Sequence, residues 1–153
     1  DINTGTLKTI RRLSMQISAR NQISGTVELI EHGKINAEIF IKLKSGYTLV
    51  SVITNTAANN LNLEIGDEVV AIFKSSTVLI TTDITLNISA RNKFQGTVDS
   101  INQDEINTEL VIDIGNNDKI ASVITSSSFE RLKIEKGTQV SAIIKASDVI
   151  IGK

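Results

Sequence analysis

Apolar and polar side chains alternate along residues 35–43, where every second residue is aliphatic. A period of two is typical of a strand that buries one face. The aliphatic series is Ile35, Ala37, Ile39, Ile41 and Leu43. Gly33 precedes this segment and Ser45-Gly46 follows it, and both are turn signals. We therefore predict a strand over 35–43 between two turns.

The same pattern returns 71 residues later, so the chain carries an ungapped internal repeat. Residues 18–80 match residues 89–151 at 26 of 63 positions. The motif Ser18-Ala19-Arg20-Asn21 recurs as Ser89-Ala90-Arg91-Asn92. Each unit has roughly 65 residues, which is small for an independent core. We therefore expect each unit to share buried surface with its sister or with another chain.

Each unit contains further short apolar runs, at 49–53, 69–73 and 78–80 in the first, and we expect the last run to close its own unit. One stretch per unit looks helical, about 55–61 and about 126–132. Thr54 and Thr125 stand directly ahead of these stretches as N-caps. Five strands with one helical turn predict an all-β fold, a tandem pair of small five-stranded OB-like barrels, each with one short helix. We place the two domains at 14–81 and 82–153.

The composition supports strands and removes most enzyme chemistry. Ile, Val and Thr make up 51 of the 153 residues, and these β-branched types favour strands. The chain has no cysteine and a single histidine, His32, which we assign to a turn. This excludes disulfides, thiolate metal sites and paired catalytic histidines, and no carboxylate dyad or nucleophile–base pair recurs. We therefore expect no catalytic residues, no protein-bound metal and no enzyme activity.

Net charge and hydropathy reduce the number of partner classes that the sequence allows. The net charge is -1 and aromatic residues make up 3%, which argues against a broad nucleic-acid surface. We find neither a long apolar run nor a basic, apolar leader, so we expect no membrane contact and a cytoplasmic location. The chain begins at Asp1. We expect residues 1–13, which lie outside the repeat, to be a linker from an upstream domain; 7–13 could form a short helix.

Polar residues that are identical in both units point to chemistry, because polar surface positions otherwise drift apart. Five such pairs carry hydrogen-bond donors: Ser18/Ser89, Arg20/Arg91, Asn21/Asn92, Thr54/Thr125 and Lys74/Lys145. A set of hydrogen-bond donors that includes two cations per unit suits a fully deprotonated oxyanion, which accepts hydrogen bonds and donates none. A simpler interpretation is also open. The arginine could pair with a glutamate across the sheet, Thr54 could be only an N-cap, and Lys74 only a solvated lysine.

These motifs, in order and at fixed spacing, resemble the Mop (molbindin) domain. The resemblance rests on Ser-Ala-Arg-Asn-Gln, Gly-Thr-Val, Ile-Asn-Ala-Glu, Val-Ile-Thr and the segment that contains Lys74, and it covers about residues 7–151. Two copies in tandem resemble a di-Mop arrangement. Residues 7–22 look like the junction that enters the C-terminal half of ModE-type molybdate-responsive transcriptional regulators.

The resemblance implies a ligand, molybdate or tungstate, held at interfaces between Mop domains that often belong to different chains. It implies that Ser18, Ala19 and Arg20 form one side of a site, and that Thr54 and Lys74 of a partner chain form the other. The family pattern has a serine three residues after the threonine, where this chain has Ala57. The second unit carries the fuller set: Ser89, Ala90, Arg91, Thr125, Ser128 and Lys145.

The sequence is compatible with three functions. The first is the ligand-sensing domain of a molybdate-dependent transcription factor, a homodimer by preference or a trimer, that would contact DNA only through an upstream domain. The second is a free-standing di-Mop storage or homeostasis protein, which the two intact signatures favour. The third is an OB-type oligonucleotide or oligosaccharide binder, against which the low aromatic content and neutral charge argue.

Overall fold

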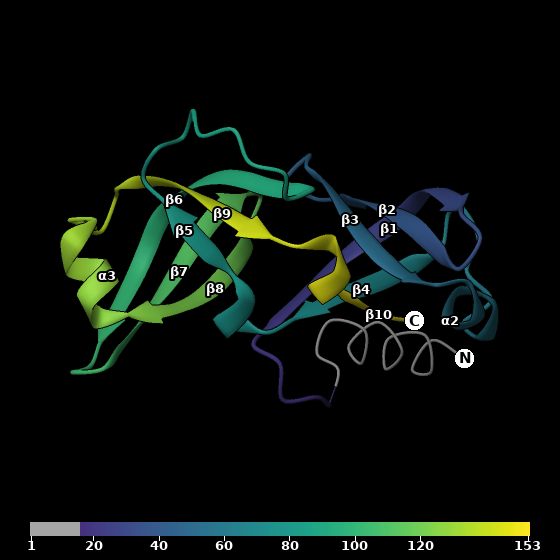
Figure 1. Ribbon diagram of the computed structural model, residues 1–153, viewed down its shortest axis with the longest axis horizontal. Coiled ribbons are helices and arrows are strands. Elements are labelled where there is room, and N and C mark those ends of the chain that lie inside the picture. Colours follow the sequence, from purple (N-terminus) through teal and green to yellow (C-terminus); the bar gives the residue numbers. More distant parts are fainter. Residues whose placement is uncertain (1–15) are drawn as a thin grey trace, which may run out of the picture.

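The computed structural model describes residues 16–153, which form two five-stranded sheets with a six-residue helix beside each (Figure 1). The predicted linker at 1–13 lies outside the described residues. The first unit contains β1 (Asn21–His32), β2 (Asn36–Leu43), β3 (Thr48–Thr54), α2 (Asn55–Asn60), β4 (Glu68–Phe73), the 3-10 turn η1 (Ser75–Thr77) and β5 (Leu79–Thr81). The second contains β6 (Asn92–Gln103), β7 (Asn107–Gly115), β8 (Asp118–Thr125), α3 (Ser126–Arg131), β9 (Gln139–Ile144), η2 (Ala146–Asp148) and β10 (Ile150–Gly152).

The sheets confirm the predicted all-β class and the tandem of small barrels. Their strand orders are β10-β4-β1-β2-β3 and β5-β9-β6-β7-β8, and neighbouring strands are antiparallel. The outer strands of each sheet also approach each other, which closes the sheet into a barrel. The helices lie at opposite ends of the long axis (Figure 1). Both begin after the predicted threonine caps.

The fifth strand of each barrel comes from the other unit. β5 pairs with β9 of the second barrel, and β10 pairs with β4 of the first. The prediction that residues 78–80 close their own unit is therefore wrong: this segment crosses to the sister barrel. The domain boundaries 14–81 and 82–153 stay a prediction for the two sequence units.

The long first strand of each unit pairs with two neighbouring strands, and a glycine allows the close approach that this requires. β1 pairs with β4 through its first half and with β2 through its second. Gly25 stands where both pairings overlap, and a Cβ built there would lie 2.5 Å from Ile41 Cγ2. At Gly96 such a Cβ would lie 2.5 Å from the Asp113 carbonyl oxygen. Only glycine therefore allows this approach of the strands.

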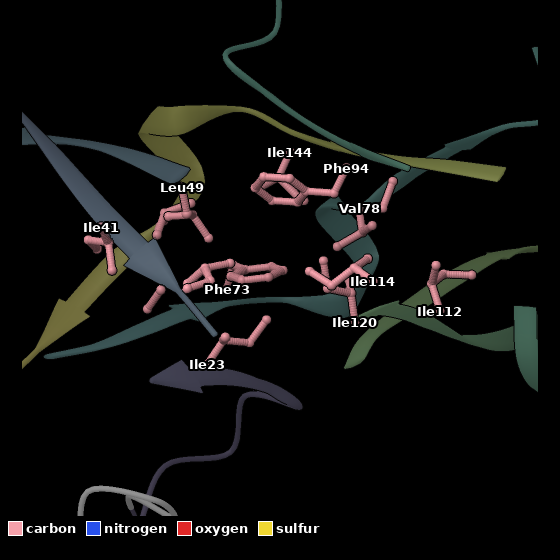
Figure 2. Close-up of a cluster of buried hydrophobic side chains, with 14 of the residues drawn as sticks. Ile23, Ile41, Leu49, Phe73, Val78, Phe94, Ile112, Ile114, Ile120 and Ile144 are labelled. Atoms are coloured by element: carbon pink, nitrogen blue, oxygen red, sulfur yellow. The ribbon is translucent and has the colours of Figure 1, made fainter. Parts of the chain in front are cut away.

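One hydrophobic core runs through both barrels, as the small size of the units led us to expect. Figure 2 shows Phe73 and Phe94 in the middle of a cluster that joins Leu49 of the first unit to Ile114 and Ile120 of the second. The aliphatic series of β2 is buried from Ala37 to Leu43.

Ile35 departs from the predicted alternation, because 74% of it is exposed. It precedes the first residue of β2, where its carbonyl oxygen accepts a hydrogen bond from the Asn55 backbone N–H at 2.8 Å. Its counterpart in the repeat, Ile106, is 75% exposed in the same setting and accepts from the Ser126 N–H. The turn geometry therefore overrides the period of two at this position.

Buried polar side chains fasten the barrels to each other in matched pairs. The Asn21 amide donates to the Ala121 carbonyl at 2.8 Å and accepts from the Ala121 N–H at 2.7 Å. Asn92 makes the same two bonds to Val50, both at 2.8 Å. Ser51 and Ser122 add reciprocal bonds of 2.7 Å that anchor the backbone ahead of each exchanged strand to the barrel that receives the strand. Because these groups are buried, the contacts fix how one barrel sits on the other.

Candidate oxyanion site

The arginine and the lysine of each repeated set meet because of strand pairing. β1 and β4 are antiparallel, and Asn21 pairs with Phe73. The next positions outward are therefore Arg20, just before β1, and Lys74, just after β4. In the second unit Asn92 pairs with Ile144, which brings Arg91 beside Lys145.

These segments line two surface hollows. The first hollow, of about 360 Å³, has walls from 17–20 and 72–77, together with Asp148 and Ile150. It therefore brings Ser18, Ala19 and Arg20 together with Lys74.

The second hollow, of about 630 Å³, is built in the same way from the second unit. Its walls include 88–91 and 145–148, so it contains Ser89, Ala90, Arg91 and Lys145. Thr77 and Asp148 line both hollows and are equivalent positions of the repeat. The two hollows thus lie on either side of this pair of residues.

Each arginine forms an ion pair with a glutamate of the other barrel. Arg20 Nη1 lies 2.8 Å from Glu109 Oε2, and Arg91 Nη1 lies 3.1 Å from Glu38 Oε1. The hydrogen bond to Glu38 and the negative charges of Glu38 and Glu31 raise the pKa of Arg91, while partial burial lowers it less. Arg91 thus keeps its positive charge at the wall of the second hollow.

The threonines lie apart from these hollows, at the far ends of β3 and β8. Thr54 Oγ1 accepts from the Ala57 backbone N–H at 3.0 Å. Thr125 Oγ1 accepts from the Ser128 N–H at 3.1 Å and donates to Ser128 Oγ at 2.9 Å. Within one chain, neither hollow therefore contains the hydroxyls of these caps.

The structure sorts the candidate residues into two groups. Serine, alanine, arginine and lysine of each unit come together, whereas Thr54, Thr125 and Ser128 lie elsewhere. The resemblance implied Lys74 and Thr54 together on a partner chain; here Lys74 shares a hollow with the Ser18 segment of its own chain. Of the simpler interpretation, the N-cap at Thr54 is observed, whereas each arginine pairs with a glutamate of the other barrel and not across its own sheet.

Sequence reasoning missed three features of this region. It counted Asn21 and Asn92 among ligand donors, but both amides are buried and bonded to the backbone of the sister barrel. It did not foresee that Glu38 and Glu109 reach across the barrel boundary, although their recurrence in the repeat was a usable signal. Asp148 gave no such signal, because the first unit has Thr77 at that position.

Within residues 16–153 we find no cluster of three or more histidine, cysteine, aspartate or glutamate side chains arranged to hold a metal ion. Over the same part of the chain, no helix combines the length and the apolar character needed to cross a bilayer.

Comparison with known proteins identifies the repeated unit. The family model for the TOBE domain matches twice, at residues 17–80 and 88–151. A solved structure described as the cytoplasmic molybdate-binding protein ModG, with molybdate bound, superposes with a TM-score of 0.87 at 40% identity. That match covers 90% of this chain and 99% of the ModG chain.

Relatives with curated names agree. The molybdenum transport protein ModE of Azotobacter vinelandii is 34% identical over 99% of this chain and 57% of its own length. The molybdenum-pterin-binding protein MopA of Rhodobacter capsulatus is 36% identical over 95% of this chain and 55% of its own. The chain thus spans little more than half of these relatives. The resemblance to tandem Mop domains is confirmed, and the chain belongs to the TOBE domain family, with two copies of the domain in succession.

Proposed function

We propose that this chain binds molybdate or tungstate as the ligand-sensing domain of a molybdate-dependent transcriptional regulator. The observation that carries the proposal is the pairing, twice in one chain, of a Ser-Ala-Arg segment with a lysine in a surface hollow. The ModG protein, which resembles this chain over nearly its full length, is described with molybdate bound. We propose a binding module and not an enzyme.

The donor set suits a tetrahedral dianion. Arginine, lysine and serine side chains and the Ala19 backbone N–H can all donate to its oxygens, and guanidinium and ammonium groups match its charge. Phosphate is partly protonated at neutral pH, and its hydroxyl donor would meet guanidinium, ammonium and backbone N–H groups that cannot accept a hydrogen bond. Sulfate has the right charge but is smaller, so its contacts would be longer.

We infer that a second copy of the chain covers each hollow. Exposed aliphatic side chains stand in both walls: Ile17 and Ile150 in the first, Ile88 and Leu79 in the second. Exposed apolar side chains that gather on one surface mark sites of protein interaction. Thr54, Thr125 and Ser128 lie outside the hollows of their own chain, so a neighbouring chain can supply these hydroxyls. We propose a homodimer, with a trimer as the alternative.

A ligand bound between chains stabilises one arrangement of those chains, since binding energy adds only to the state that holds the ligand. In a regulator, that arrangement would set the spacing of two upstream DNA-binding domains. The match to ModE relatives favours this function. The alternative is a free-standing di-Mop storage protein in the cytoplasm, which the 99% coverage of ModG favours. The reading frame upstream of Asp1 distinguishes the two: a winged-helix domain or a start codon.

Calorimetric titration tests the binding proposal. We expect molybdate and tungstate to bind, phosphate to bind much more weakly, and Arg20→Ala or Lys74→Ala to weaken molybdate binding by about tenfold or more, since each removes a charge-assisted contact worth about 1.4 kcal/mol. Lys136→Ala is the matched control, because Lys136 is exposed and lines neither hollow. Unchanged affinity in both site variants, or equal affinity for phosphate, would reject the proposal.

A further inference from the structure

The two Arg–Glu ion pairs form a matched set that the binding proposal does not use. Arg20 and Arg91 each precede the first strand of their unit, and Glu38 and Glu109 occupy equivalent places on β2 and β7. Both pairs cross from one barrel to the other, with N–O distances of 2.8 and 3.1 Å. The recurrence of the pair in both directions shows that it is built into the contact between the barrels.

The neighbouring asparagine explains why these charges meet. Asn92 is anchored to Val50 on β3, and Val50 pairs with Phe40 on β2. Arg91 precedes this anchor, and Glu38 lies two residues before Phe40 on the adjacent strand. The anchored backbone therefore places Arg91 beside the strand that carries Glu38.

Each glutamate contacts a single guanidinium nitrogen. Within residues 16–153, Nη1 is the one nitrogen of Arg20 and of Arg91 that is bonded to a carboxylate. A guanidinium carries five N–H donors, so Nε and Nη2 keep theirs for another acceptor. The arginine side chains are 56% and 45% exposed, so they remain accessible from solvent. An ion pair through one nitrogen therefore orients the arginine side chain and leaves N–H donors available for a ligand.

We propose that Glu38 and Glu109 are positioning residues of the two hollows, each orienting the arginine that the other barrel contributes to oxyanion binding. This inference rests on the proposed function. Both units then contribute to each hollow, because one unit supplies the arginine and the other supplies the carboxylate that orients it. A long side chain fixed before binding loses less entropy when the ligand arrives.

The two arginines are not held equally. The Arg91 guanidinium also stands over the Phe40 ring, with its carbon 5.9 Å from the ring centroid, within cation–π range. The second unit has Val111 at the position equivalent to Phe40, so Arg20 lacks this ring. Arg91 is accordingly the less exposed of the two. The second hollow should therefore bind the oxyanion more tightly than the first.

Titration of molybdate into the full chain, and into single variants, tests the role of the glutamates. We expect Glu38→Ala to weaken binding at one class of sites by about two- to fivefold, the range for a partly exposed ion pair. Glu38→Gln should lose less, because the amide oxygen still accepts from Nη1. Glu109→Ala and Glu109→Gln should repeat this pattern at the other class. The rescue by glutamine separates orientation of the arginine from a general loss of structure.

A charge control, a further variant and a folding control accompany these titrations. Glu64→Ala removes the same charge from an exposed, repeated glutamate away from both hollows, and it corrects for the change in net charge. Phe40→Val, which installs the residue of the second unit, should bring the affinity of the tighter sites toward that of the weaker ones. The thermal midpoint without ligand identifies any variant that fails to fold.

The outcomes distinguish this inference from the proposed function. If the glutamate variants bind molybdate as tightly as Glu64→Ala does, the carboxylates play no part in binding. If these variants bind molybdate more tightly, the carboxylates compete with the ligand for the arginines. The inference then fails while the binding proposal stands. If Arg91→Ala itself leaves binding unchanged, the proposed function fails first.

Discussion

Replacement of Asn92 by alanine should destabilise the whole molecule, although the residue belongs to neither hollow wall. Its amide makes two hydrogen bonds of 2.8 Å to the backbone of Val50, and both residues are buried, at 0% and 6% exposure. Alanine would leave the Val50 N–H and C=O without these partners. A buried unsatisfied group costs about 1–3 kcal/mol, so the two together should cost about 2–6 kcal/mol of unfolding free energy.

Thermal unfolding followed by circular dichroism measures this loss. For a chain of this size, each kcal/mol lowers the midpoint by about 2–4 °C, so we expect a decrease of roughly 4–24 °C. Asn102→Ala on the same strand is the control, because Asn102 is exposed and its expected effect is within about 0.5 kcal/mol.

Asn92→Asp gives a second view of the same contact. It keeps the shape and one acceptor of the side chain, but it replaces the donor to the Val50 carbonyl with a buried charge. We expect a loss at least as large as that of Asn92→Ala. If neither variant unfolds at a lower temperature than Asn102→Ala, the asparagine does not fasten the barrels and the reasoning is refuted.

Three further substitutions test the fold. Gly25→Ala should cost about 2 kcal/mol or more in urea unfolding, because its Cβ would meet Ile41 and the Lys42 carbonyl; a neutral result would mean that the strands can part there. Ser141→Val should raise the thermal midpoint, because the buried Ser141 hydroxyl has no hydrogen-bond partner among the described residues. The first unit has Val70 at the equivalent position, and a lower midpoint would contradict this expectation. Tyr47→Phe should cost about 1 kcal/mol in urea unfolding by removing the bonds between its hydroxyl and Gln95 of the other barrel, and no loss would mean that water replaces them.

The local elements were predictable because their signals are local. The alternation through β2, the threonine caps of both helices and the repeat all identify structure within a few residues or at a fixed offset. The strand exchange was not predictable in the same way. Residues 78–80 are equally suited to either barrel, and only the direction of the chain after η1 determines which sheet receives them.

The candidate site was predictable in composition but not in arrangement. The repeat identified Arg20, Lys74 and their counterparts, and strand pairing explains why they meet. The repeat could not separate ligand donors from residues that join the barrels, because residues of both kinds are identical in the two units. Asn21 shows this: its donor is consumed by a backbone carbonyl 100 residues away, a contact that depends on how the barrels dock.

The central claim is that the paired arginine and lysine hollows hold an oxyanion. Anomalous diffraction at a tungsten absorption edge, from crystals grown with tungstate, locates the ligand directly. We predict tungsten peaks in both hollows, one beside the Arg20 and one beside the Arg91 guanidinium, with side chains of a second copy of the chain closing over them. Tungsten bound elsewhere, with both hollows open to solvent, would contradict the account.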